Sequence, residues 1–189
     1  MNSVIWGPLF WKTFDMIAVS HDQRSSTRAI QMIRNFQYLL PCRYCRESMQ
    51  RFVADANHDS TNPLRFVYDL HTRVNGKLEK TVPAAFSFAV YETRQKLLGT
   101  QLSLYDVNNL ITILAANYDH NPEPAQETAW RYFWQMLPDY IQDPNLRAAL
   151  RAVRLPTNRP LSSRVLRQVL RLSNTTWKKV ESMRNWKDQ

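Results

Sequence analysis

Cysteine and glycine are both scarce: cysteine occurs 2 times and glycine 3 times in 189 residues, against 10 prolines. Two cysteines cannot build the disulfide framework of a small secreted domain. Few glycines leave few sites for the left-handed turns that join strands in hairpins, and strand-like alternation of apolar and polar residues is hard to find. These absences exclude a disulfide scaffold and disfavour a β-sheet fold.

Long apolar segments are missing as well. No run of about 18 apolar residues is present that would span a bilayer. Residues 1–6 hold no basic segment followed by an apolar stretch, so we expect no signal peptide and no secretion. A lone cysteine pair in a protein that is not secreted is more often catalytic or metal-binding than structural.

Helical periodicity is what the sequence does contain. Apolar residues recur at spacings of three and four in the segments 6–18, 29–40, 42–53 and 63–78, which short polar loops separate. We therefore predict an all-α fold that begins with a four-helix bundle. Thr61 or Asn62 is expected to cap the fourth helix, with Pro63 in its first turn. A short fifth helix is predicted from about residue 84 to Leu98, because Gly99 is a typical helix terminator.

The pattern stays helical in the second half of the chain. Prolines divide it into segments of about 103–118, 123–137, 143–154, 161–172 and 174–186. We predict two domains, residues 1–99 and a second small helical domain of residues 100–189. Four large residues at helical spacing are expected in a core or a dimer interface rather than a ligand site: Trp130, Phe133, Trp134 and Leu137.

The net charge of +9 belongs to the C-terminal quarter, where residues 145–189 hold 11 basic and 2 acidic residues. Helical spacing places these basic residues on two helix faces: Arg147, Arg151 and Arg154, then Arg164, Arg167 and Arg171. One interpretation is a solvated face beside an apolar one. The other is a surface within residues 147–187 that binds an acidic protein partner or nucleic acid through its phosphates.

The two cysteines form the motif Pro41-Cys42-Arg43-Tyr44-Cys45. Cys-x-x-Cys spacing brings both sulfurs close enough to bond or to share a metal. Pro41 ends the preceding helix, so Cys42 is expected at the N-terminus of the next one, where the partial positive charge favours a thiolate. The motif predicts a reactive pair rather than two cysteines that only pack.

Three kinds of site can use such a pair. A thioredoxin-like site needs a βαβ context, which the helical flanks do not provide. A zinc site would have to use Cys42, Cys45, His58 and His71, but the two histidines are 13 positions apart, wider than the usual zinc spacing. The third is a dithiol that passes electrons to a cofactor held in the helical bundle.

Two further segments accompany the cysteine motif: Trp6-Gly7-Pro8-x-x-Trp11 before it, and His71-Thr-Arg-Val-Asn-Gly-Lys-Leu-Glu-Lys80 after it. Together the three resemble the Erv/ALR family of FAD-linked sulfhydryl oxidases, and most closely the members encoded by large cytoplasmic DNA viruses. They occur in the family's order and at about its spacing. The resemblance covers residues 6–83, under half of the chain.

The resemblance implies a four-helix bundle that holds FAD, with Cys45 next to the flavin and Cys42 exchanging with substrate. Trp11 would border the flavin, His71 would stack on the adenine and Lys77 would meet the pyrophosphate. Apart from the resemblance, two positions are open to Tyr44: it shields the disulfide from solvent, or it faces outward. No metal is expected, and the full set of candidate FAD-binding residues is Gly7, Pro8, Trp11, Asp15, Tyr44, His71, Val74, Asn75, Lys77 and Lys80.

The function implied is a thiol oxidase that makes disulfide bonds in protein substrates, virion proteins above all. Electrons would pass from substrate thiols through the cysteine pair to FAD and then to molecular oxygen, giving hydrogen peroxide. The resemblance also implies a homodimer and a location in the host cytoplasm at virus assembly sites, or in the virion. The alternative is a non-catalytic helical interaction module, stabilised by zinc, with a basic docking surface.

The chain departs from the family pattern at three points. Asp15 stands where the family has His, and Thr72 stands where it has Asn. A carboxylate near a reduced, anionic flavin is unfavourable unless it points away or is protonated. No cysteines remain for the family's structural disulfide or its shuttle pair, so substrate thiols must come to Cys42 directly.

Overall fold

Every regular element that the structure describes is an α-helix, which confirms the predicted all-α fold. The computed structural model describes residues 3–20, 25–55, 61–80, 87–99, 101–118, 121–152 and 155. Its helices are α1 (Ser3–Val19), α2 (Ser26–Leu39), α3 (Arg43–Ala54), α4 (Pro63–Lys77), α5 (Phe88–Leu98), α6 (Leu104–Ala116), α7 (Pro124–Tyr140) and α8 (Pro144–Ala152). The segments predicted over 161–172 and 174–186 lie outside the described residues.

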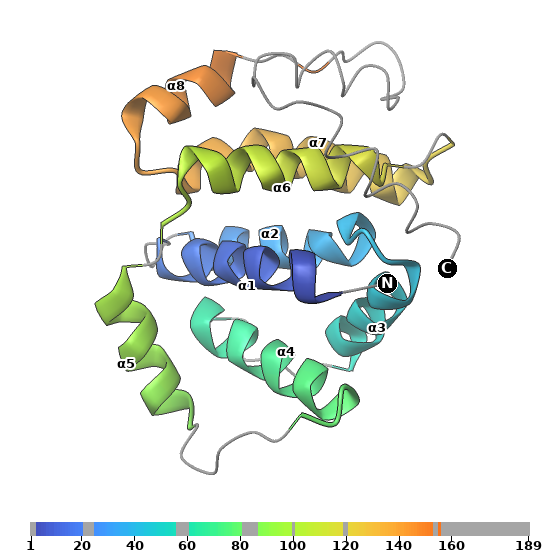
Figure 1. Cartoon of the computed structure of the whole chain (residues 1–189), viewed down its shortest axis with the longest axis vertical. Helices are drawn as coiled ribbons and strands as arrows, with labels where there is room; N and C mark the ends of the chain where they lie inside the picture. Colours follow the sequence, from blue (N-terminus) through green and yellow to red (C-terminus); the bar gives the residue numbers. More distant parts are fainter. Residues whose placement is uncertain are drawn as a thin grey trace.

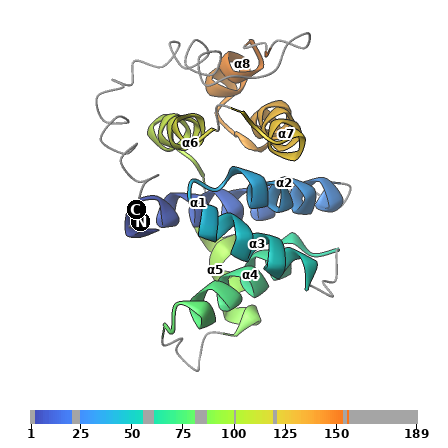
Figure 2. The same ribbon diagram turned by 90° about the vertical axis from the view of Figure 1, so that its right-hand side faces the viewer.

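The helices stack in layers, with α1 and α2 in the middle (Figure 1). On one side lie α6 and α7, and on the other lie α3, α4 and α5, an order that the view at right angles also shows (Figure 2). Helix α8 packs on α7, away from the middle layer. The predicted bundle of four helices corresponds to α1–α4, in which α2 contacts each of the other three.

Phe36 of α2 lies at the centre of the apolar core and is fully buried. Its ring makes edge-to-face contacts with Phe14 and Phe10 of α1, at 4.9 and 5.7 Å between centroids, and with Phe133 of α7 at 5.6 Å. This geometry is the one that aromatic pairs prefer. This side chain therefore joins α1, α2 and α7, and so links the segments before and after residue 99. The division of these segments into two domains stays a prediction.

Large apolar residues of α7 are part of this core. All four that were expected in a core or an interface are buried: Trp130, Phe133, Trp134 and Leu137. Trp130 packs against both Phe133 and Trp134, with ring centroids 5.8 and 6.5 Å apart. The core interpretation is confirmed for these residues.

Several helix ends were predicted correctly from the local sequence. Asn62 caps α4, since its Oδ1 accepts a hydrogen bond from the Arg65 amide at 3.1 Å, and Pro63 is the first helical residue. Gly99 ends α5 with a φ of 52°, a left-handed conformation that suits glycine. Its amide donates to the Gln95 carbonyl at 3.2 Å.

Two predicted boundaries were wrong. Helix α5 begins at Phe88 and not near residue 84, because the Ser87 hydroxyl caps it by accepting from the Val90 amide. Helix α7 runs through Pro138 to Tyr140 instead of ending at residue 137. A proline removes its own amide and crowds only the preceding turn, so the residues after it can remain helical.

Part of the basic C-terminal region is described, and there the arginines contact groups of the same chain. Arg147 Nε donates to the Ile141 carbonyl at 2.8 Å, at the turn between α7 and α8. Arg151 pairs with Asp139 of α7 at 2.7 Å. The other basic residues of the two predicted faces lie outside the described residues: Arg154, Arg164, Arg167 and Arg171.

Within the described part of the chain, none of the helices combines the length and the apolar character that crossing a membrane requires.

The Phe36 contacts predict a large effect of truncation. Phe36→Ala should lower the free energy of unfolding by about 3–5 kcal/mol, because it removes a fully buried ring and leaves a cavity between three helices. The measurement is urea denaturation followed by circular dichroism. Leu97→Ala is the control, since Leu97 is 82% exposed and its loss should change stability by less than about 0.5 kcal/mol. Equal effects of the two substitutions would contradict this account of the core.

Candidate functional site

The cysteine motif forms the corner between α2 and α3. Cys42 is the N-cap residue of α3, with extended backbone angles, and its Sγ accepts a hydrogen bond from the Cys45 amide at 3.3 Å. The Cys42 carbonyl accepts from the Arg46 amide at 2.9 Å, which closes the first helical turn. The prediction that Cys42 lies at a helix N-terminus is confirmed.

The two arginines in the first turn of α3 have different partners, and Arg46 holds this corner. Arg46 Nη1 donates to the carbonyl of Leu40, the residue that ends α2, at 2.8 Å. Arg43 pairs with Glu47 one turn further along α3, at 3.0 Å on the exposed side. The Arg46 bond ties the end of α2 to the start of α3 and so fixes the position of both cysteines.

The two thiols differ in exposure, and neither is in a disulfide in this structure. Cys42 is 8% exposed, whereas Cys45 is half-buried and packs against the core from one side. The resemblance predicts that Cys42 meets substrate and that Cys45 faces the flavin. A group bound against Cys45 would cover the more accessible thiol, and the unequal roles of the two cysteines stay a prediction. Tyr44 between them is 70% exposed.

Cys45 lies in an environment that opposes ionisation. Its pKa is raised to about 12, chiefly by burial and then by the hydrogen bond and charge of Cys42, while the charge of Lys77 acts in the opposite direction. Lys77 reaches α3 from the end of α4, where its Nζ donates to the Ser48 hydroxyl. Ser48 in turn donates to the Tyr44 carbonyl at 2.7 Å.

Trp11 of α1 and His71 of α4 lie face to face, with ring centroids 4.2 Å apart and planes inclined by 28°. Both side chains are half-buried. Burial, and then the charge of Lys80, lowers the pKa of His71 below its usual range, so the imidazole is neutral at neutral pH. The structure thus brings together two of the residues that the resemblance assigned to FAD.

The last turns of α4 carry the remaining candidates. Val74 and Asn75 are half-buried on the side of His71, whereas Lys77 and Lys80 are exposed. The Lys80 amide donates to the Asn75 carbonyl at 3.0 Å, so the chain turns back on itself after the helix. We refer to His71, Val74, Asn75, Lys77 and Lys80 together as the strip; it begins with an imidazole within α4 and ends with two cations at and beyond the last residue of that helix.

Gly7 and Pro8 lie near the start of α1, one turn before Trp11. Pro8 is exposed and Gly7 is half-buried. A Cβ added to Gly7 would meet no atom within 4 Å, so there is open space beside the helix at this point. Because Gly7 and Trp11 are four residues apart, this space lies on the face of α1 that carries Trp11.

Asp15 has a partner that the sequence analysis missed. Tyr91 of α5 donates its hydroxyl to Asp15 Oδ1. Burial raises the pKa of Asp15 to about 6, although the Tyr91 hydrogen bond and the charge of Arg94 both lower it. Burial and the nearby Asp15 also raise the pKa of Tyr91. No local motif marks Tyr91, which stands out only as a buried residue at helical spacing from Phe88 and Gln95.

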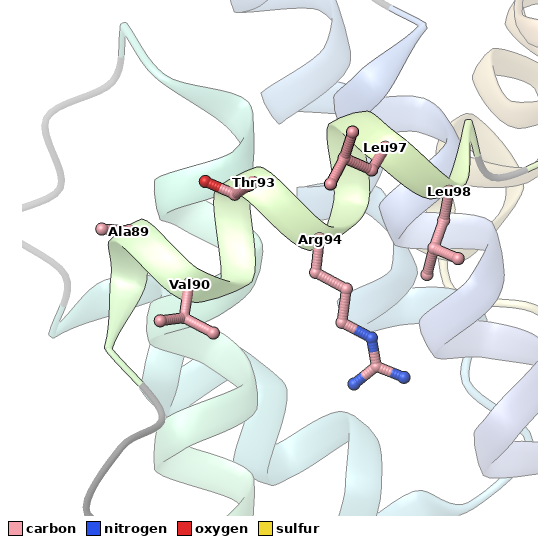
Figure 3. A pocket seen from close by; sticks show the side chains of 6 residues that line it. All are labelled: Ala89, Val90, Thr93, Arg94, Leu97 and Leu98. Carbon is pink, nitrogen blue, oxygen red and sulfur yellow. The ribbon is translucent and has the colours of Figure 1, made fainter.

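Two further observations concern other kinds of site. In the described ranges no group of three or more His, Cys, Asp and Glu side chains could hold a metal ion, and His58 lies outside those ranges. A shallow hollow follows α5 and is lined by that helix alone (Figure 3). Apart from Arg94, which acts on Asp15, none of its lining residues contributes to the site.

The raised pKa of Asp15 predicts a pH-dependent cost in stability. Its carboxyl binds a proton more tightly in the folded chain, at a pKa of about 6, than at the ordinary value of 3.8. The native state is therefore penalised as pH rises from about 4 to 7. Asp15→Asn should remove a penalty on the order of 1–3 kcal/mol above pH 7.

The measurement is urea denaturation of both proteins at intervals between pH 4 and 8. The stability difference between Asp15→Asn and the natural chain should grow through this interval and then level off. A difference that is constant with pH would contradict the burial of this carboxyl.

Comparisons with known proteins identify the family of the chain. The sequence profile of the Erv1/Alr family matches residues 8–95. A protein of Invertebrate iridescent virus 3 that carries the assignment FAD-linked sulfhydryl oxidase is 30% identical over 90 residues, and the match covers 43% of this chain and 61% of that relative, less than two thirds of its length. The FAD-linked sulfhydryl oxidase of African swine fever virus is 30% identical over 103 residues, covering 50% of this chain and 85% of the relative. No solved structure matches. The chain therefore belongs to the Erv1/Alr family.

Proposed function

We propose that the chain is an FAD-linked thiol oxidase that forms disulfide bonds in protein substrates, with Cys42 and Cys45 as the redox-active pair. The observation that carries the proposal is the position of this pair at the start of α3, where Lys77 reaches across from the strip on α4. The names of the two viral relatives, both FAD-linked sulfhydryl oxidases, support the same activity.

The residues around the pair fit FAD. Trp11 and His71 already stack on each other, so each half-buried ring has one face left for a ligand, and an imidazole face can stack on adenine. Open space adjoins Gly7 on the Trp11 face of α1. Lys77 and Lys80 are exposed cations that can meet a pyrophosphate. We assign Trp11 to the flavin end, and we assign His71, Val74, Asn75 and the two lysines to the adenosine and phosphate end.

The thiol chemistry follows from the pair itself. A substrate thiolate attacks Cys42 Sγ of the Cys42–Cys45 disulfide, a mixed disulfide forms, and Cys45 leaves as a thiolate. A second substrate thiolate then attacks the substrate sulfur of the mixed disulfide. Substrate leaves oxidised by two electrons, and both cysteines are left reduced. The Cys45 amide, which already donates to Cys42 Sγ, can stabilise negative charge on that sulfur.

Bound FAD would take two electrons from the reduced pair and pass them to oxygen. Two thiols and one oxygen molecule would thus give one disulfide and one hydrogen peroxide. The Asp15–Tyr91 hydrogen bond holds this carboxyl toward α5. This position limits the repulsion expected between the Asp15 carboxylate and a reduced, anionic flavin.

The setting of the reaction is also a proposal. Because the two relatives are viral proteins, we place the oxidase in the host cytoplasm during virus assembly, or in the virion, acting on virion proteins. A homodimer is expected from the resemblance. A further partner of the basic region, either acidic protein or nucleic acid, stays a prediction.

The test is oxygen consumption by the protein loaded with FAD and supplied with a dithiol. The natural chain should turn over, whereas Cys42→Ser and Cys45→Ser should each lower kcat by at least about 100-fold, because either one prevents the disulfide that accepts substrate electrons.

Arg51→Met is the matched control, since Arg51 is exposed in the last turn of α3 and belongs to neither the pair nor the strip. It should keep its activity. Failure of the natural chain to bind FAD, or full activity of Cys45→Ser, would contradict the proposal.

A further inference from the structure

Lys77 is placed to act on Cys45 as well as on a phosphate. Its Nζ donates to the Ser48 hydroxyl on α3, a contact between residues 29 positions apart. Ser48 follows Cys45 by three residues, so the two side chains share one face of the helix with their Cβ atoms about 5–6 Å apart. Lys77 therefore contacts the helix face that carries Cys45, and its charge acts on that thiol.

Two arginines near Cys45 are engaged by other groups, whereas the charge of Lys77 acts on the Cys45 thiol. On α3 itself, Arg43 is paired with Glu47 and the Arg46 guanidinium donates to the Leu40 carbonyl at the corner with α2. Cys42 and burial both oppose a negative charge on Cys45, and Lys77 favours it. Lys77 is thus the α4 cation that offsets this penalty, and Ser48 is the residue that holds it there.

We propose that Lys77 is a positioning residue for thiol chemistry, held by Ser48 so that its ammonium stabilises the thiolate of Cys45. Charge develops on this sulfur when a substrate thiolate attacks Cys42 Sγ, because the Cys42–Cys45 bond breaks and its electron pair leaves on Cys45. A stabilised leaving thiolate departs faster. Lys77 would therefore speed substrate oxidation before any contact with the cofactor.

This inference rests on the thiol chemistry of the proposed function, but it can be tested without FAD. In FAD-free protein carrying Cys42→Ser, the alkylation of Cys45 by iodoacetamide is followed against pH. Adding Lys77→Met should slow alkylation about 3- to 10-fold at pH 8, because an opposite charge at this range shifts a pKa by about one unit and solvent screens part of it. Lys77→Arg should restore most of the rate.

Two further variants separate a local effect from a general one. Arg51→Met removes one positive charge from the same helix and should leave the alkylation profile unchanged. Ser48→Ala should slow alkylation by a smaller factor than Lys77→Met, since the lysine keeps its charge but loses its anchor. In FAD-free protein with both cysteines, Lys77→Met should also slow reduction of the Cys42–Cys45 disulfide by dithiothreitol.

An unchanged profile for Lys77→Met would overturn the inference, and so would an equal slowing by Arg51→Met. If Lys77→Met weakens FAD binding but leaves alkylation unchanged, Lys77 is a phosphate ligand only and the inference fails while the proposed function stands. If the natural chain binds no FAD but Lys77→Met still slows alkylation, the proposed function fails and the inference stands.

Discussion

The burial of Phe36 between α1, α2 and α7 is the contact on which the other helix positions depend. It fixes α1 in the middle layer, and α1 then presents polar and aromatic side chains to three different neighbours. These contacts are Lys12 with Asp106 of α6 at 2.7 Å, Trp11 with His71 of α4, and Asp15 with Tyr91 of α5. The candidate cofactor site is thus built on a helix that the core holds in place.

Burial also sets the electrostatics of the site. Both Asp15 and Cys45 are acids whose pKa is raised because the surrounding apolar groups disfavour their charged forms. Each has a partner on another helix that partly offsets this penalty, a tyrosine hydroxyl for Asp15 and an ammonium for Cys45. The carboxyl is held toward α5, and the sulfur remains open to a cation from α4. The two acids are therefore stabilised by different helices, Asp15 from α5 and Cys45 from α4.

Features that depend on neighbouring residues in the sequence could be predicted. Pro41 and the apolar period placed Cys42 at a helix start, Asn62 and Gly99 marked helix ends, and Trp130 was expected in a core. The all-α class followed from the same periodicity. These features share one cause, since helix geometry relates each residue to those within four positions of it.

Contacts between helices could not be predicted from spacing alone. Tyr91 and Asp15 are 76 positions apart, and Lys77 and Ser48 are 29 apart, so their meeting depends on how whole helices pack. The sequence assigned Lys77 to a phosphate, whereas the structure shows its contact with α3. The continuation of α7 past Pro138 was missed for a related reason, because that residue is buried and tertiary packing supports the last turn.

The central claim is that electrons pass from thiols through the Cys42–Cys45 pair to a flavin bound by this chain. The most direct measurement is the visible flavin absorbance of the FAD-loaded protein after anaerobic addition of dithiothreitol. The natural chain should lose this absorbance within the dead time of manual mixing, and the variant with both Cys42→Ser and Cys45→Ser should keep it under the same conditions. Absence of bound flavin, or equally fast bleaching in both proteins, would contradict the claim.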